Sequence, residues 1–98
     1  MKIAKEKDDS ILTIALEGRL DTNTSPELTR VLEDNLTGVA VLVMDMGQLD
    51  YISSAGLRVL LAAQKEMAKQ GKMVLKNVSP NVLEVLEITG FSGILTLE

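Results

Sequence analysis

Two apolar runs in the first half of the chain are typical of β-strands. The run Ile11–Leu16 is rich in β-forming residues and ends at Gly18. The preceding segment, Lys2–Lys7, predicts a short edge strand, and the turn Asp8–Ser10 is too short for a crossover, so the two pair antiparallel. Val39–Met44 is continuously apolar with three valines. Such a run is typical of a central parallel strand buried on both faces.

Helical spacing takes over between these runs. Ser25-Pro26 supplies a hydroxyl at the N-cap and Pro at the first position of a helix that ends at Gly38. Its apolar face is formed by Leu28, Val31, Leu32 and Leu36. A second helix is predicted from about Ala55 to Gln70. Ser79-Pro80 repeats the start signal for a third, which runs up to Gly90.

Two further strands complete the pattern, Met73–Val78 and a short last one at Ile94–Leu97. The resulting β-β-α-β-α-β-α-β order predicts an α/β fold with a mixed, largely parallel sheet, because strands that alternate with helices need right-handed crossovers. With 98 residues and no linker or repeat, residues 1–98 form one domain.

Composition narrows the function. The chain has no Cys and no His, which excludes disulfides, thiolate or imidazole metal sites and a Ser-His-Asp triad. We therefore expect no metal, no cofactor and no enzyme activity. The net charge of −4 argues against a nucleic-acid partner. No apolar run is long enough to span a bilayer and the charged N-terminus has no signal core, so a cytoplasmic protein without membrane insertion is predicted.

Candidate function lies where the parallel strands end. In open α/β sheets ligands and partners gather at the carboxyl ends of the strands. Three predicted loops share that edge: residues 18–24, residues 47–54 and residues 77–79. The topology therefore brings Asp21, Asn23, Ser53 and Ser54 to one side of the molecule.

The second of these loops carries the most specific signal. Ser53 and Ser54 stand at the start of a helix, where free N–H groups and the helix dipole stabilise anions. A phosphate on Ser54 would therefore be tolerated, and Ala55 and Gly56 would leave room for a partner or a kinase to approach. The plainer interpretation is that the serines only cap the helix. Asp21 and Asn23 have a similar alternative as turn residues that hydrogen-bond their own backbone.

The segment Asp50–Leu57 resembles the signature of the STAS domain, which occurs in bacterial anti-sigma factor antagonists and at the ends of sulfate transporters. Leu16–Asp21 resembles the family's Gly-x-Leu/Ile-Asp segment. Val43–Met46 resembles its central strand, and Ile88–Phe91 resembles its late helix-to-strand turn. Together the four segments cover nearly the whole chain in the family's order and spacing.

The resemblance implies a partner-switching regulator of transcription. In that family the unphosphorylated antagonist binds an anti-sigma factor that is also a serine kinase, phosphorylation of one serine releases the complex, and a serine phosphatase resets it. The modified serine corresponds to Ser54, with Ser53 as the alternative. Asp21, Asn23, Ser53, Ser54, Gly56 and Leu57 are the expected partner-binding residues, with a supporting role for Asp21.

Two departures from the family pattern shape further expectations. Ser53 stands where many antagonists have an acidic residue. The family usually ends in another helix packed on the sheet, so part of an apolar face is expected to be less covered, giving a monomer or weak dimer. The alternatives are an unphosphorylated STAS module that binds a small anion or nucleotide, or a soluble subunit of a transport system. An enzyme that uses carboxylates or Lys alone has the least support.

Overall fold

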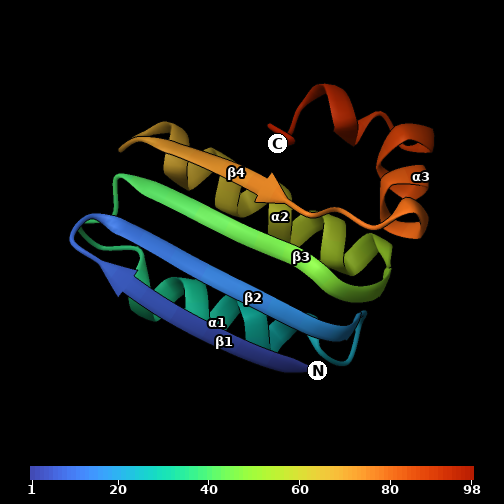
Figure 1. Cartoon of the computed structure of the whole chain (residues 1–98), viewed down its shortest axis with the longest axis horizontal. Helices are drawn as coiled ribbons and strands as arrows, with labels where there is room; N and C mark the ends of the chain where they lie inside the picture. Colours follow the sequence, from blue (N-terminus) through green and yellow to red (C-terminus); the bar gives the residue numbers. More distant parts are fainter.

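The computed structural model describes residues 1–98 and folds them into a four-stranded sheet with helices behind it (Figure 1). The elements in chain order are β1 (Lys2–Asp8), β2 (Ile11–Leu20), α1 (Ser25–Asn35), β3 (Val41–Ile52), α2 (Ser54–Ala68), β4 (Lys72–Lys76), α3 (Pro80–Ile88) and a 3₁₀ turn, η1 (Phe91–Gly93). The sheet order is β1-β2-β3-β4. β1 is antiparallel to β2, and the other neighbours are parallel. The predicted α/β class with a mixed, largely parallel sheet is confirmed.

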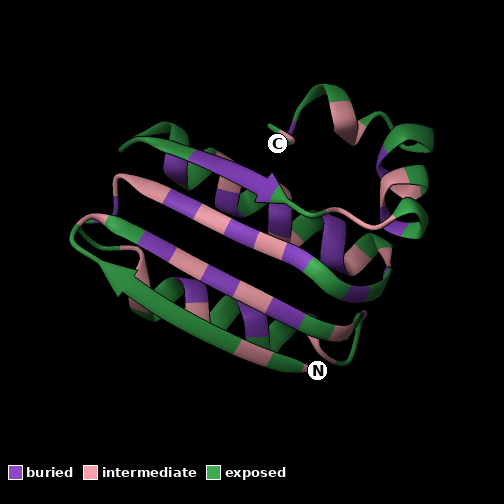
Figure 2. Ribbon diagram, viewed as in Figure 1, coloured by how far each residue is buried: buried purple, intermediate pink, exposed green.

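The core lies between the sheet and the helices. Alternate residues of β2 and β3 point into it, and the buried ones are Leu12, Ile14, Leu16, Leu20, Leu42, Met44, Met46, Leu49 and Ile52. Leu28, Leu60, Met67 and Leu86 meet them from the helices. The alternating purple and pink bands of β2 and β3 show that the other face of the sheet is only half-buried (Figure 2). The expectation that the central strand is buried on both faces is therefore wrong, because α1 and α2 both lie behind it (Figure 1).

β2 and β3 are longer than the sequence predicts. β3 was expected to end at Met44 but continues to Ile52, and β2 continues through Gly18 to Leu20. Residues that the sequence pattern assigned to loops are therefore part of the two strands. The two extensions pair with each other as Gly18↔Leu49 and Leu20↔Ile52. Irregularities in the register between these pairs let Leu20, Leu49 and Ile52 all reach the core.

The predicted last strand shortens to a single parallel bridge, Leu75↔Leu97. Leu75 donates its N–H to the carbonyl of Thr96 and accepts the N–H of Glu98, both at 2.9 Å. The 3₁₀ turn and the helical backbone of Ile94 leave too few extended residues for a longer ladder. None of the helices is both long and apolar enough to cross a membrane.

Candidate functional site

The candidate site is the corner where β2 and β3 end. The N–H of Ser53 donates to the carbonyl of Leu20 at 2.9 Å, which ties the start of α2 to the end of β2. Asp21 follows directly on β2, so the loop that carries Asp21 and Asn23 lies beside the two serines. The topology argument from the sequence predicted this juxtaposition.

The two serines at this corner have different surroundings. Ser53 is the N-cap of α2, with extended backbone, and its Oγ accepts the N–H of Gly56 at 3.4 Å. It is half-buried. Ser54 is the first helical residue, is exposed, and its hydroxyl makes no hydrogen bond within the chain. The capping interpretation therefore applies to Ser53, and the hydroxyl of Ser54 is free to react.

Gly56 and Leu57 lie in the first turn of α2, on its buried side. Both are buried, and Leu57 is only 6% exposed. A Cβ added at Gly56 would lie 2.7 Å from Cγ of Leu20 and 2.9 Å from Cγ1 of Ile52. The missing side chain thus makes room for the ends of β2 and β3, and not for a partner as expected from the sequence. Gly56 thus lets the start of α2 pack closely on the strand ends, and Leu57 belongs to the core.

Asp21 organises the turn that leads into α1. Its Oδ1 accepts the N–H groups of Asn23 at 3.0 Å and Thr24 at 3.1 Å, and also the Thr24 hydroxyl at 3.2 Å. The backbone hydrogen bond from Thr24 is the main cause that lowers the pKa of Asp21, and Arg19 contributes in the same direction. These hydrogen bonds are the ones expected if Asp21 serves as a turn residue that binds its own backbone. Asn23 is exposed on the same turn.

The start of α1 differs from the predicted cap. Thr24 occupies the N-cap position, and it makes no side-chain cap hydrogen bond. Ser25 is the first helical residue, is 5% exposed, and donates its hydroxyl to the carbonyl of Asp21 at 2.5 Å. The prediction of a structural role for Ser25 holds, but the contact is a turn closure and not a cap. Ser79 does cap α3, accepting the N–H of Val82 at 3.4 Å.

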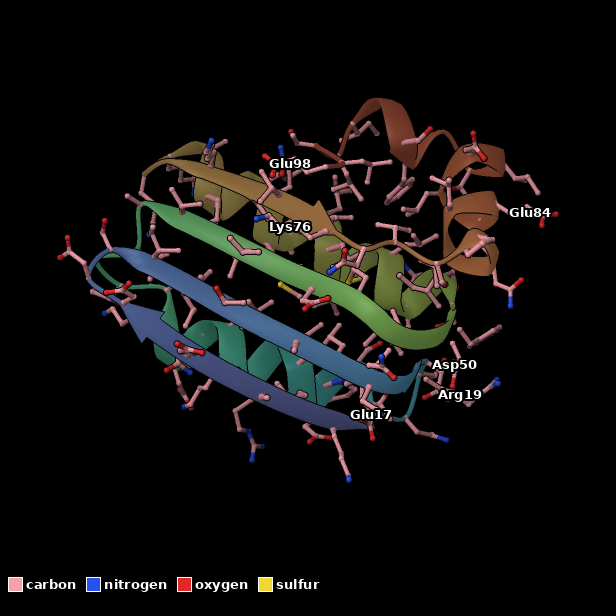
Figure 3. The ribbon with its side chains drawn as sticks, viewed as in Figure 1. Glu17, Arg19, Asp50, Lys76, Glu84 and Glu98 are labelled. Atoms are coloured by element: carbon pink, nitrogen blue, oxygen red, sulfur yellow. The ribbon has the colours of Figure 1, made fainter.

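Arg19 and Tyr51 belong to the corner although the sequence did not single them out. They are register partners on β2 and β3, and the Arg19 guanidinium lies 4.1 Å from the centroid of the Tyr51 ring. Arg19 Nε is also 3.9 Å from Oδ2 of Asp21. In Figure 3 the labelled Arg19 and Asp50 both lie at this end of the sheet. The missed signal was the pairing of the two strand extensions, which were assigned to loops.

The third predicted loop joins the sheet at a different level. β4 ends at Lys76, opposite Asp45, whereas β3 continues to Ile52. Asn77 Nδ2 donates to Oδ1 of Asp45 at 3.2 Å, and Ser79 Oγ donates to the carbonyl of Leu49 at 3.2 Å. This loop therefore contacts β3 at Asp45 and Leu49, and α3, which follows it, lines a hollow together with the end of β3.

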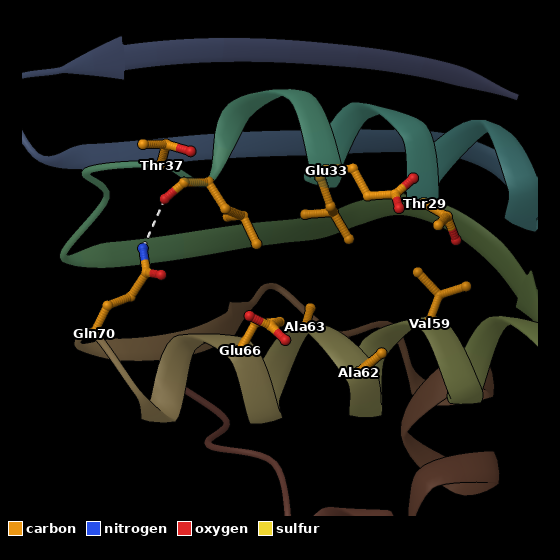
Figure 4. Close-up of a pocket in the computed structure, with 10 residues that line it drawn as sticks. Thr29, Glu33, Thr37, Val59, Ala62, Ala63, Glu66 and Gln70 are labelled. Atoms are coloured by element: carbon orange, nitrogen blue, oxygen red, sulfur yellow. Dashed lines mark hydrogen bonds between the residues drawn. The ribbon is translucent and has the colours of Figure 1, made fainter.

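A hollow of about 470 Å³ lies away from this corner, between α1 and α2 (Figure 4). Glu33 and Glu66 stand at its rims. At one end Gln70 Nε2 donates to the carbonyl of Leu36 at 2.6 Å. None of the residues predicted for the site lines it. No three His, Cys, Asp or Glu side chains gather where they could hold a metal ion.

Comparison with known proteins gives one consistent result. Residues 2–98 match the sequence profile of the family described as STAS domain. The chain is 41% identical to BtrV of Bordetella bronchiseptica, over 96% of this chain and 83% of BtrV. BtrV is described as an anti-sigma factor antagonist. It is 31% identical to the anti-sigma-B factor antagonist of Listeria monocytogenes, over 96% of this chain and 84% of that protein.

Solved structures of low identity share the fold. The anti-sigma factor antagonist SpoIIAA in its unphosphorylated form superposes with a TM-score of 0.85 at 21% identity, covering 99% of this chain and 88% of that one. Bacillus SpoIIAA in the phosphorylated form superposes with a TM-score of 0.77 at 20% identity, covering 99% and 91%.

Proposed function

Because the chain belongs to the STAS domain family, among its anti-sigma factor antagonists, we propose that Ser54 is the switch of a partner exchange. With Ser54 unmodified, the corner at the ends of β2 and β3 binds an anti-sigma factor that is also a serine kinase. The kinase transfers a phosphate to Ser54, and the complex separates. A serine phosphatase in the same cytoplasmic compartment removes the phosphate and restores binding.

One observation carries the assignment to Ser54. Its hydroxyl is exposed and has no partner within the chain, whereas the hydroxyl of Ser53 is engaged with the N–H of Gly56. Phosphorylation of Ser54 therefore breaks no internal hydrogen bond. Phosphorylation of Ser53 would remove the cap of α2.

The position also explains how a phosphate can act without unfolding the domain. A phosphoserine carries a charge of roughly −1.5 to −2 at neutral pH. At the first residue of α2 the helix dipole and the free N–H groups stabilise that charge. A partner docked on Ser54 would have to desolvate it, so the cost falls on the complex. SpoIIAA, which shares this fold, is known in both unphosphorylated and phosphorylated forms, which supports the proposal.

The two serines can be separated with single variants. The protein is incubated with ATP and the serine kinase encoded nearest to it, and the intact mass is measured. We expect one phosphate on the wild type, one on Ser53→Ala and none on Ser54→Ala. Ser53→Ala is the matched control, because it removes the neighbouring hydroxyl and leaves Ser54 in place.

The opposite pattern, with phosphate lost in Ser53→Ala and kept in Ser54→Ala, would transfer the switch to Ser53. Absence of phosphate on the wild type with every candidate kinase would contradict the proposed switch. The chain would then be left with the alternative role of a binding module that is not modified.

A further inference from the structure

The face of the sheet turned away from the helices is a second surface of this molecule. We call it the open face. Its centre is formed by Ile11 and Thr13 of β2, by Val41, Val43 and Asp45 of β3, and by Val74 of β4. It is turned toward the viewer in Figure 1, with α1 and α2 behind the sheet. A shallow hollow of about 490 Å³ lies over it, lined only by strand residues and Glu98.

The open face is apolar along β2 and the first half of β3, where no helix covers it, whereas Val74 of β4 is only 3% exposed. Ile11 is 43% exposed, and Val41 and Val43 are half-buried although they stand on a central strand. The same strands bury their alternate residues completely on the helix side, where Leu42 and Met44 are 0% exposed. Contiguous apolar patches of a few hundred Å² are often functional on small proteins.

The strand registers place opposite charges at the two edges of this face. One row across the sheet runs Asp8, Ile11, Val41, Lys72, from β1 to β4. Directly paired residues in a sheet share a face, so the row has a carboxylate at one end, two apolar side chains in the middle and an ammonium at the other end. Three strand spacings of about 4.8 Å separate Asp8 from Lys72, about 14 Å in all, and neither makes a salt bridge within the chain.

Each of the two neighbouring rows carries a charge at one edge only. In the next row Glu6 stands at the β1 edge and Val74 at the β4 edge. In the row after it, Ala4 stands on β1, Ala15 on β2, Asp45 on β3 and Lys76 on β4. The β1 edge is thus acidic and the β4 edge basic over this half of the sheet. Glu98, 4.0 Å from Lys76, and Asp45, its register partner on β3, offset the charge of Lys76, so the basic edge depends mainly on Lys72.

We propose that the open face is the interface of a symmetric dimer, with a second copy of this chain as its occupant. The two-fold axis runs parallel to the strands, midway between the two sheets. Each row then faces the same row of the second copy in reverse order, with β1 over β4 and β2 over β3. Asp8 then lies over Lys72 of the second copy, and Ile11 lies over Val41 of the second copy. Glu6 falls between the two basic positions of β4. Two packed sheets with nearly aligned strands are a standard arrangement.

The charges also select the direction of the axis. A two-fold axis across the strands would place β1 over β1, with carboxylates facing carboxylates, and β4 over β4, with lysines facing lysines. Such contacts between like charges are unfavourable. The chosen axis covers the rows near Ile11 and Val41 and leaves the strand ends beyond Ile52 free. Both Ser54 hydroxyls therefore remain accessible and lie at the same end of the dimer.

The size of the face makes this dimer weak. Four strands about 4.8 Å apart and five residues at about 3.4 Å each give a plan area of roughly 300 Å². Even with the relief of the side chains this is below the ~800 Å² per partner of a standard stable interface. We therefore expect self-association only at high concentration, between about 100 µM and 1 mM.

A charge exchange tests the geometry. Sedimentation velocity and diffusion NMR, from about 10 µM to 1 mM at low salt, should show the wild type moving from monomer to dimer. Asp8→Lys and Lys72→Glu should each weaken dimerisation about tenfold, because each turns two attractive contacts per dimer into repulsive ones. The double variant Asp8→Lys/Lys72→Glu should restore the wild-type constant to within about twofold. The two positions are too far apart within one chain for such a rescue to be intramolecular.

Asp34→Lys on α1 and Lys65→Glu on α2 are the matched controls, with the same charge changes on exposed positions of the helical layer. They should leave dimerisation unchanged. A wild type that stays monomeric at about 1 mM overturns the proposal and leaves the face to another occupant. Self-association that both exchanges leave intact places the contact elsewhere, and a double variant without rescue refutes the two-fold axis. None of these outcomes alters the phosphorylation test on Ser54.

Discussion

Replacing Gly56 by Ala should destabilise the domain although Ala is the better helix former. Gly56 lies in the first turn of α2, against the ends of β2 and β3. An added Cβ would lie 2.7 Å and 3.0 Å from Cγ and Cδ2 of Leu20, and 2.9 Å from Cγ1 of Ile52. Both neighbours are buried, Leu20 completely, so neither can move aside without displacing other core residues.

Two effects of opposite sign decide the magnitude. Gly→Ala within a helix gains at most about 1 kcal/mol. Overpacking a closed core costs about 1–3 kcal/mol, and contacts shorter than 3.0 Å with buried side chains place the cost here in the upper part of that range, about 2–3 kcal/mol. We expect a net loss of about 1–2 kcal/mol in the free energy of unfolding. Since the unfolding entropy is about 2.1 cal/mol/K per residue, a chain of this size loses about 5 °C in Tm for each kcal/mol.

Urea denaturation followed by circular dichroism measures this loss, with Gly93→Ala as the control. A Cβ at Gly93 would meet nothing within 4 Å, so this variant should keep the wild-type stability to within about 0.5 kcal/mol. A Gly56→Ala protein as stable as the wild type, or more stable, would refute the close packing of α2 on the strand ends.

Three further predictions concern the same corner. Ser53→Ala should lower the free energy of unfolding by about 0.5–1 kcal/mol through loss of the cap, and an unchanged urea midpoint would contradict the capping role. The pKa of Asp21 is lowered, chiefly by the hydrogen bond from the Thr24 N–H. The ionised carboxylate therefore stabilises the folded state at pH values above its unfolded pKa of 3.8. This stabilisation is lost as the pH falls through the lower pKa of the folded state. The stability difference between wild type and Asp21→Asn should accordingly shrink below about pH 4, and a difference that does not change with pH would argue against this. Ser54→Asp should leave the free energy of unfolding unchanged or raise it by about 0.3–1 kcal/mol through the helix dipole, whereas a clear fall in Tm would show that Ser54 is not at an exposed helix start.

Local patterns predicted most of the fold because each element carries its own period and stop signals. The helix from Ser54 to Ala68 and the edge strand from Lys2 to Asp8 lie within two residues of their expected bounds. The extension of β3 to Ile52 was missed. Its Gly, Gln and Asp residues are typical of a loop, and it forms a strand only because it pairs with the end of β2, which also has a loop-like sequence.

The position of the site was predictable, but the roles within it were not. Topology alone brought Asp21 and Ser54 together, since the carboxyl ends of neighbouring parallel strands meet. The division of labour between Ser53 and Ser54 depends on which hydroxyl reaches the N–H of Gly56, and that is decided by backbone angles. The stacking of Arg19 on Tyr51 depends on the register of the strand extensions, which no local pattern encodes.

The central claim is that a charge added at Ser54 acts on the complex and not on the fold. Titration calorimetry of the cognate anti-sigma factor against wild type, Ser54→Ala, Ser54→Asp and the phosphorylated protein tests it directly. We predict that Ser54→Ala binds within about twofold of the wild type, and that the phosphorylated form binds about a hundredfold more weakly or worse, with Ser54→Asp between them. Equal affinity of the phosphorylated and unphosphorylated forms would contradict the account.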